Sequence, residues 1–277
     1  MKIKLVALDI DGTLLDSQGA LPSENVKAIE ETLRQGVKII LVTGRRSGTA
    51  LKVAASLKLD GPIIVHNGAL IKTPQTPHRI RSQFIQRETA RHILSNTEHF
   101  REFVVLHCDK STPGQQVVHS STRRNPVLQN YLSHFPDGVS ETRDLMGVLD
   151  DDLIQLMFCG QLAAVREIED YLLLNDLSRQ VTMTKTYYAE KDLGIIDLLD
   201  KGCSKGSALK FLASHYGLMP EEILAIGDNH NDLEMLEFAG IGVIMGNSVQ
   251  ELKSRGFHET ASNNDGGVAL ALRQYVG

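Results

Sequence analysis

The stretch "LVALDIDGTLLD", residues 5 to 16, ends a short apolar run in two carboxylates, Asp9 and Asp11, with one isoleucine between them. Two carboxylates about 4 Å apart repel each other by about 4 kcal/mol at an effective dielectric constant of about 20. A core strand that ends in two such groups therefore needs a positive partner at its carboxyl end.

Three further apolar runs follow the same pattern, in which a strand leads into a turn and then into helical periodicity. They are "VKIILVTGR" (37–45), "EEILAIGDN" (221–229) and "GIGVIMGN" (240–247). Near-continuous apolar strands that alternate with helices are typical of a parallel sheet covered on both faces. The sequence therefore predicts an α/β fold whose core is a Rossmann-like doubly wound parallel sheet.

Two of the expected helices have recognisable starts. Ser23 is expected to cap a helix that carries Val26, Ile29 and Leu33 on one face and stops at Gly36. Ser204 is expected to cap a second helix, whose inward residues are Ala208, Leu209, Leu212, Ala213 and Tyr216.

The middle of the chain changes character after "KTPQTPHR" (72–79), whose two prolines predict a hairpin or a hinge. Beyond this point the pattern predicts helices at 86–97, 126–134 and 161–174, and strands at 103–108, 115–119, 153–158, 181–187 and 193–199. Hairpins mixed with helices indicate an antiparallel α+β unit. We therefore expect an inserted α+β domain at 84–198, within a core formed by 1–83 and 199–277.

Composition narrows the class of protein. The chain has 277 residues, 42% of them hydrophobic and 23% charged, which is ordinary for a globular protein. Its net charge of −5 argues against a nucleic-acid partner, and the N-terminal apolar run is too short for a signal peptide or a membrane span. Its three cysteines are widely spaced, which favours reduced thiols in the cytoplasm. No obligate protein partner is evident.

Polar groups gather where the predicted parallel strands end. Asp9 and Asp11 follow the first strand, Thr43 follows the second, and Asp228 with Asp232 follows a later one. In an open α/β sheet, ligands bind beyond the carboxyl ends of the strands, so four carboxylates are expected to converge. A single aspartate at the end of a strand would be an ordinary turn residue, but four carboxylates together predict a bound hard divalent cation such as Mg²⁺.

The positive and neutral groups nearby suit a phosphate. Lys205 lies at the start of a capped helix, where both the ammonium and the helix dipole favour an anion. Thr43 offers a hydroxyl, the turn that follows it offers backbone amides, and Asn231 offers a side-chain amide. Arg45 either reaches the substrate or, as the plainer alternative, forms a surface ion pair.

These segments, in this order, resemble the motifs of a known family, the haloacid dehalogenase-like hydrolases. The four motifs are "DIDGTL" (9–14), "TGR" (43–45), "SKG" (204–206) and "GDNHND" (227–232). The long insert between the second and third motifs, with "HNGA" (66–69) before it and "NDGGVALAL" (264–272) near the end, resembles the Cof-type subclass IIB. The resemblance spans essentially the whole chain, and the first and last motifs are the most specific.

The resemblance implies a role for each matching residue. Asp9 would be the nucleophile that forms an aspartyl-phosphate, and Asp11 the general acid and base. The transferring phosphoryl group would be held by Thr43, Lys205, Asn231 and the backbone of Ile10 and Gly44. Mg²⁺ would be bound by Asp9, the carbonyl of Asp11 and Asp228, with support from Asp232 and Asn229.

The function expected on these grounds is a Mg²⁺-dependent phosphatase for a small phosphorylated metabolite, such as a sugar phosphate or a nucleotide or cofactor phosphate. The insert would select the substrate. A phosphomutase of the same subclass is the nearest alternative. A phospho-aspartate signalling or binding protein without turnover is a more distant one, because receiver domains have no such insert.

Overall fold

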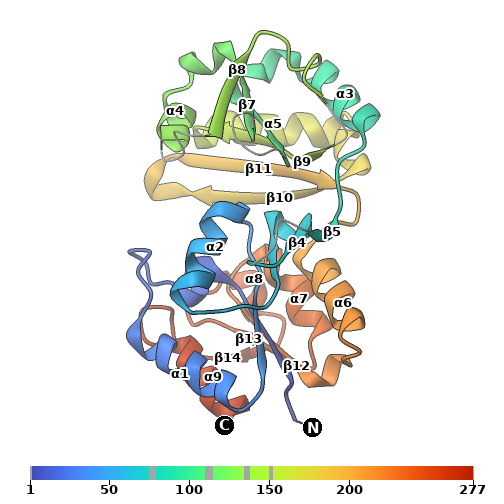
Figure 1. Cartoon of the computed structure of the whole chain (residues 1–277). Coiled ribbons are helices and arrows are strands. Elements are labelled where there is room, and N and C mark those ends of the chain that lie inside the picture. Colours follow the sequence, from blue (N-terminus) through green and yellow to red (C-terminus); the bar gives the residue numbers. More distant parts are fainter. Residues whose placement is uncertain (1, 75–78, 110–114, 134–137, 150–151, 277) are drawn as a thin grey trace. The chain divides into compact units, whose positions relative to one another are not determined.

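A computed structural model describes residues 2–74, 79–109, 115–133, 138–149 and 152–276. Contacts within the chain divide it into two compact units (Figure 1), here called unit 1, Met1–Ser82 with Cys203–Gly277, and unit 2, Gln83–Gly202. Unit 2 is thus inserted in the sequence of unit 1, and each unit has its own sheets and core.

Unit 1 is built on a parallel sheet of five strands in the order β14-β13-β12-β1-β2. The bounds are β1 Leu5–Leu8, β2 Lys38–Leu41, β12 Ile223–Gly227, β13 Ile241–Ile244 and β14 His258–Glu259. The chain adds β2 on one side of β1 and the later strands on the other, so the winding reverses between β1 and β12. The predicted doubly wound sheet is confirmed, and the reversal creates the switch point at which such sheets bind ligands.

Helices cover the sheet of unit 1. They are α1 Ser23–Arg34, α2 Ser47–Ser56, α6 Lys205–His215, α7 Leu233–Phe238, α8 Gln250–Lys253 and α9 Gly267–Tyr275. The predicted inward residues Ala208, Leu209 and Leu212 of α6 are fully buried and pack against β1 and β12 side chains. Helices α1 and α9 lie side by side (Figure 1) and are joined by Asn25, whose Oδ1 accepts the backbone N–H of Ala269 at 3.1 Å.

The two predicted helix caps have different outcomes. Ser204 caps α6 as expected, because its side chain accepts the N–H of Ser207 while the Ser207 hydroxyl accepts the N–H of Ser204, both at 3.0 Å. The prediction for Ser23 is wrong. Pro22 is the N-cap of α1, and Ser23 is the exposed first helical residue without a capping bond. Proline fixes its own φ and the chain enters the helix directly after it.

The buried face of α1 also differs from the predicted one. Ile29 is buried as expected, but Val26 and Leu33 are half-buried, and the buried positions around Ile29 are Asn25, Ala28 and Thr32. Asn25 explains the shift, because its side chain is bonded to the backbone of two other segments and fixes the rotation of the helix.

Unit 1 also contains a small antiparallel sheet, of which the sequence indicated only the hairpin or hinge around 72–79. Its strands are β3 Ile63–Val65, β4 Leu70–Lys72 and β5 Arg79–Ser82. β4 and β5 form the hairpin expected around 72–79, although residues 75–78 of its connection lie outside the described residues. An isolated bridge between Val42 and Ile64 ties β3 to the end of β2.

Unit 2 is an α+β unit with a six-stranded sheet in the order β10-β11-β9-β6-β7-β8. The bounds are β6 Val104–Cys108, β7 Gln116–His119, β8 Val139–Thr142, β9 Leu153–Gly160, β10 Val181–Tyr188 and β11 Leu193–Asp200, with helices α3 Arg87–Asn96, α4 Pro126–Ser133 and α5 Leu162–Leu174. All strand pairs are antiparallel except β7 with β8. The expected helices and strands are confirmed, but β8 was not predicted and residue 134 lies outside the described part.

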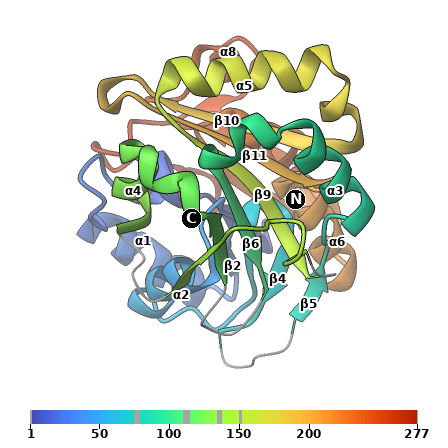
Figure 2. The ribbon, with the colours of Figure 1, turned by 90° about the horizontal axis from the view of Figure 1, so that it is seen from above.

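The two faces of this sheet are covered differently. α3 and α5 pack on one face (Figure 2), where Ile93, Val165 and Ile168 join the core of unit 2. α4 covers part of the opposite face through Leu128 and Leu132. The strand register places the polar residues Gln116, His107 and Gln155 on that second face as well.

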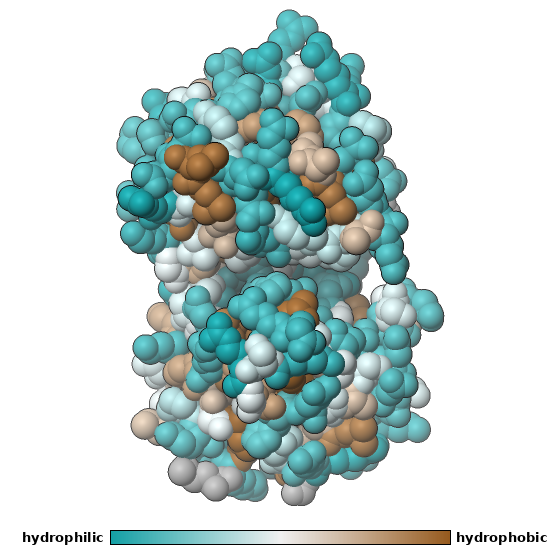
Figure 3. All heavy atoms as spheres, turned by 180° about the vertical axis from the view of Figure 1, so that it is seen from behind, coloured by the Kyte–Doolittle hydropathy of each residue, from teal (hydrophilic) through white to brown (hydrophobic). Residues whose placement is uncertain are grey.

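The surface seen in Figure 3 is mostly hydrophilic, with hydrophobic side chains in small separate areas. Cys108, Cys159 and Cys203 are buried thiols. Within the described ranges, every helix is too short or too polar to cross a bilayer.

Candidate active site

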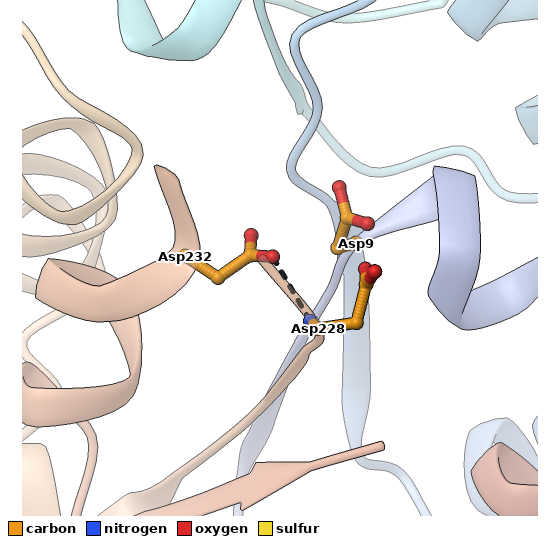
Figure 4. Close-up of side chains that lie close together, drawn as sticks. All are labelled: Asp9, Asp228 and Asp232. Atoms are coloured by element: carbon orange, nitrogen blue, oxygen red, sulfur yellow. Dashed lines mark hydrogen bonds between the residues drawn. The ribbon is translucent and has the colours of Figure 1, made fainter. Parts of the chain in front are cut away.

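Three carboxylates meet at the switch point of unit 1. Asp9 follows β1, Asp228 follows β12, and Asp232 lies in the short 3-10 turn after it (Figure 4). Each offers an oxygen that lies within 4.8 Å of the others, and the residues are 3%, 8% and 0% exposed. Three hard oxygen donors at this spacing fit a divalent cation such as Mg²⁺.

Lys205 is the positive partner that the opening sequence stretch required. Its Nζ donates to Asp9 Oδ1 at 2.6 Å and to Asp232 Oδ1 at 2.7 Å, and the residue is 2% exposed. Burial lowers the pKa of the ammonium, but the charges of Asp232 and Asp9 outweigh burial and raise that pKa above its usual range. Lys205 is therefore charged and joins the first helical turn of α6 to the cluster.

One ammonium does not balance three carboxylates. Burial raises the pKa of Asp9 well above its usual range, against the opposing effect of Lys205. Burial and the charge of Asp232 raise the pKa of Asp228 to about 7, although the Thr13 hydroxyl stabilises its charged form by donating to Oδ1 at 2.9 Å. When ionised, the cluster carries two negative charges in excess, which is the charge that a divalent cation neutralises.

Asp232 organises the loop as well as the lysine. Its Oδ2 accepts the backbone N–H groups of Asp228 and Asn229, both at 3.0 Å, and the first of these bonds is drawn in Figure 4. The Asn229 side chain accepts the N–H of His230 at 2.8 Å. Both residues therefore stabilise the turn that presents Asp228.

Asp11 does not join the carboxylate cluster, which corrects the predicted convergence of four. Its carboxylate forms a two-point ion pair with Arg45, with Nε to Oδ2 at 2.7 Å and Nη2 to Oδ1 at 2.5 Å. The Asp11 side chain is 57% exposed. The guanidinium of Arg45 binds a carboxylate at two points, and this geometry explains why Asp11 lies apart from the buried acids. Arg45 therefore forms the ion pair that the sequence analysis gave as its second possible role, and Asp11 is its partner.

The predicted phosphate-binding residues are linked by Asn67. Asn67 donates its N–H to the Thr43 carbonyl at 3.0 Å, and its Oδ1 accepts from Asn231 Nδ2 at 2.9 Å. At Gly44 a Cβ would lie 2.9 Å from Asn67 Oδ1, so a larger residue there would displace the Asn67 side chain. Ile10 is fully buried and its backbone follows Asp9 directly.

Sequence reasoning missed Asn67 and Thr13 as site residues. Asn67 has a φ of 51°, in the left-handed region that asparagine tolerates, and it is 3% exposed. A usable signal was present, because "HNGA", which contains Asn-Gly, directly follows the apolar strand β3, which an isolated bridge ties to the end of β2. The contact of Thr13 with Asp228 joins positions 215 residues apart and has no local signature.

Comparisons with known proteins agree with this geometry. The family described as haloacid dehalogenase-like hydrolase matches residues 6–272. The stress response protein YhaX of Bacillus subtilis is 31% identical over 99% of this chain and 94% of its own length. The 5-amino-6-(5-phospho-D-ribitylamino)uracil phosphatase YwtE of the same organism is 28% identical over 99% of this chain and 98% of its own.

A solved haloacid dehalogenase-like hydrolase from Bacteroides thetaiotaomicron superposes with a TM-score of 0.80 at 25% identity, over 99% of both chains. The family match covers nearly the whole sequence, and the resemblance of the motifs is confirmed. The chain therefore belongs to the haloacid dehalogenase-like hydrolase family and is an enzyme of the phosphatase type.

Proposed function

We propose that this protein is a Mg²⁺-dependent phosphatase that hydrolyses a small phosphorylated metabolite through an aspartyl-phosphate on Asp9. The observation that carries the proposal is the buried group of Asp9, Asp228 and Asp232 around the Lys205 ammonium. Burying three carboxylates costs folding free energy, and a site for chemistry explains why they are retained.

The reaction proceeds in two displacements at phosphorus. A carboxylate oxygen of Asp9 forms a bond to phosphorus while the ester P–O bond breaks. Asp11, protonated and released from its ion pair with Arg45, gives its proton to the leaving alcohol oxygen. Water then attacks the phosphorus of the aspartyl-phosphate, Asp11 takes a proton from this water, and the Asp9 carboxylate is released together with inorganic phosphate.

Charge and position supply most of the catalysis in phosphoryl transfer. Mg²⁺, held by Asp9, the Asp11 carbonyl and Asp228, with Asp232 and Asn229 in support, would offset the repulsion between phosphate and carboxylate. Lys205 neutralises the same region from the helix α6 side. Thr43, Asn231 and the backbone of Ile10 and Gly44 hold the phosphoryl oxygens in this proposal, and the Asn67 bonds that order two of these groups support it.

The relatives support a metabolite substrate. YwtE, YitU and YcsE of Bacillus subtilis, each 27–28% identical, are named as phosphatases of 5-amino-6-(5-phospho-D-ribitylamino)uracil. A sugar phosphate or a nucleotide or cofactor phosphate is accordingly the substrate class proposed here. Residues 84–198 are proposed to select among such compounds. The buried thiols support action in the reducing cytoplasm.

A phosphomutase is the second candidate, because it would use the same aspartyl-phosphate and return the phosphoryl group to substrate. A dependence on a bisphosphate activator distinguishes it from a phosphatase. A phospho-aspartate signalling protein would instead keep the phosphoryl group on its aspartate for long periods and would not release phosphate steadily.

The first prediction tests the nucleophile and the ion together. Asp9→Asn should abolish release of phosphate from an aryl phosphate and prevent labelling of the protein by a radioactive substrate, since the amide is a poor nucleophile. Chelator should abolish the wild-type activity, and added Mg²⁺ should restore it. Asp60→Asn, at an exposed aspartate of unit 1, is the matched control and should keep full activity. Label on another residue of the Asp9 variant, or full wild-type activity in chelator, would contradict the proposal.

A further inference from the structure

A groove of about 280 Å³, here called the α2 groove, lies in unit 1 between α2 and the segment that precedes α1. Leu15, Leu21 and Val53 form its apolar lining. Its charged residues are Arg45, two residues before α2, and Lys52 on α2. Among the described residues that line the groove, none is an aspartate or a glutamate. The α2 groove therefore combines two positive charges with a small apolar surface.

The residues that α2 contributes to the groove lie on one face of the helix. Thr49, Lys52, Val53 and Ser56 recur at spacings of three and four residues, which bring side chains together on a helix surface. The hydroxyls of Thr49 and Ser56 donate to the carbonyls of Arg46 and Val53, at 3.0 and 2.8 Å, so neither hydroxyl proton is left for a ligand. The charged side chains are therefore the donors that the groove offers.

The two cations of the groove differ in what they already bind. Lys52 is exposed and forms no ion pair with another described residue, and its ammonium has three N–H donors. Arg45 instead bonds both carboxylate oxygens of Asp11, which uses two of the five N–H donors of its guanidinium. One cation of the groove is thus uncommitted, and the other is shared with the proposed general acid.

Size and charge restrict the ligand of the groove. Pockets for drug-sized molecules have volumes of about 300–1,000 Å³, so a groove of about 280 Å³ suits a compact group. Two cations in a lining without acids favour an anion. Phosphate, sulfate and carboxylate groups all form charge-assisted hydrogen bonds with lysine and with arginine. The chemistry of the α2 groove therefore fits a small oxyanion.

We propose that the α2 groove binds a small oxyanion, such as inorganic phosphate or a carboxylate, through Arg45 and Lys52, and that this anion competes with Asp11 for Arg45. The Asp11 side chain is 57% exposed, and its two bonds to Arg45 restrict the carboxylate. Without them the side chain samples more rotamers, and ordering it for proton transfer costs conformational entropy. The anion therefore inhibits, and phosphate, as the product, would exert feedback. This effect on catalysis rests on the proposed function, whereas binding of the anion does not.

Calorimetry with sodium sulfate and with sodium acetate tests binding and compares a tetrahedral oxyanion with a carboxylate. Chelator keeps the buried acid cluster negative, so that it repels anions, and sodium chloride keeps the ionic strength constant. Lys52→Gln should weaken binding about tenfold, the scale of one charge-assisted hydrogen bond. Lys52→Arg should bind as wild type does, and so should Lys210→Gln, at an exposed lysine of α6.

The stronger of the two anions assigns the source. Tighter binding of sulfate indicates a phosphate-like ligand, and tighter binding of acetate indicates a carboxylate. No binding of either anion to wild type, or equal binding to wild type and Lys52→Gln, would overturn the α2 groove as a site.

Steady-state rates test the competition with Asp11. Sulfate at about ten times its dissociation constant should lower the wild-type kcat for an alkyl phosphate about threefold, the cost of ordering one side chain. The kcat for an aryl phosphate should fall much less, because its leaving group depends less on an acid. Lys52→Gln should have the wild-type kcat without sulfate and should lose most of the sulfate effect.

Three results would overturn the competition. A rise in KM alone that Lys52→Gln retains would place sulfate in the active site. An equal fall of kcat in both proteins would indicate that salt screens the pair of Asp11 and Arg45. Sulfate that binds in the groove and leaves kcat unchanged would show that Asp11 does not respond. If wild type hydrolyses no phosphate ester, the proposed function fails, while calorimetry still decides whether the groove binds an anion.

Discussion

At the residue scale, the ion pair between Asp11 and Arg45 bears on the proton transfer proposed for Asp11. A general acid contributes most where the leaving oxygen is basic, with effects of about 10²- to 10⁴-fold. Asp11→Asn should therefore slow hydrolysis of alkyl phosphates, such as sugar phosphates, by about 10²-fold or more, and aryl phosphates much less. The measurement is kcat/KM for a series of esters graded by the pKa of the leaving alcohol.

Arg45 provides the matched comparison for this prediction. Because its guanidinium contacts Asp11 through two bonds, Arg45→Gln should reproduce part of the leaving-group dependence. In a protein that already carries Asp11→Asn, Arg45→Gln should have little further effect, since the effects of substitutions at two contacting residues do not add. An equal loss across all leaving groups for Asp11→Asn would assign Asp11 a structural role.

Whether a site residue could be predicted from the sequence depends on whether its neighbours in the chain carry a recognisable pattern. Asp9, Asp228 and Lys205 each stand at the end of a strand or the start of a helix, and their meeting could be predicted from the topology of a parallel sheet. Asp11 stands next to the same strand end, but the preference of its carboxylate for Arg45 depends on side-chain geometry. Asn67 acts through a left-handed backbone conformation, which the Asn-Gly pair indicates, and through contacts with two other loops, which nothing in the sequence indicates.

At the element scale, the start of α6 matters for both stability and chemistry. Ser204 caps this helix and also bonds the Glu234 carboxylate, and the next residue is Lys205. Ser204→Ala should lower the free energy of unfolding by about 1 kcal/mol, the usual value of an N-cap. It should also lower kcat/KM for all substrates in common, because Lys205 would lose the helix end that orders it.

Ser23→Ala is the control for this prediction. Ser23 is the exposed first residue of α1 and makes no capping bond, so its loss should change the stability by less than about 0.5 kcal/mol and leave activity intact. Urea denaturation and steady-state rates of both variants check the pair. Similar effects of the two substitutions would remove the distinction between the two helix starts.

The same contrast shows why elements were easier to predict than their details. Long apolar runs and 3.6-residue periodicity located the strands of the parallel sheet and most of unit 2. The strands β3 and β4 have only 3 residues each, too few for alternation to be distinguished from a loop. Strand β8 is as long as β1 and β2 but is mostly polar, so it lacks the apolar run that located them. At Ser23 two capping signals competed, and the fixed φ of Pro22 prevailed over the hydroxyl.

At the scale of the whole molecule, the fold holds together acids that would otherwise repel. Asp9 and Asp228 lie far apart in the sequence, and β1 and β12 pair to bring them side by side. The folded state therefore carries a local charge conflict that the unfolded chain does not have. Residues kept against stability in this way are expected at functional sites.

Because the pKa of Asp228 is raised, the repulsion between the buried acids makes the stability of the protein depend on pH. Because the folded-state pKa of Asp228 is raised to about 7 from an ordinary value near 4, the folded protein binds this proton more tightly than the unfolded chain does. Its contribution to stability is therefore full below about pH 4 and is lost as the pH rises to about 7. In chelator, Asp228→Asn should accordingly melt at a higher temperature than wild type at pH 8, with a smaller difference at pH 5.

Mg²⁺ should reverse the order of the two proteins. A ligand that binds only the folded state at 100 times its dissociation constant stabilises by about 2.7 kcal/mol, which for a chain of this size corresponds to several degrees of melting temperature. Wild type at pH 8 should gain this shift, whereas Asp228→Asn, which retains the acceptor for Thr13 but lacks the charge, should gain little. Asp60→Asn should behave as wild type throughout. Equal Mg²⁺ shifts in wild type and Asp228→Asn would show that the ion binds elsewhere, and a wild type more stable than Asp228→Asn in chelator at pH 8 would show that the buried acids are not in conflict.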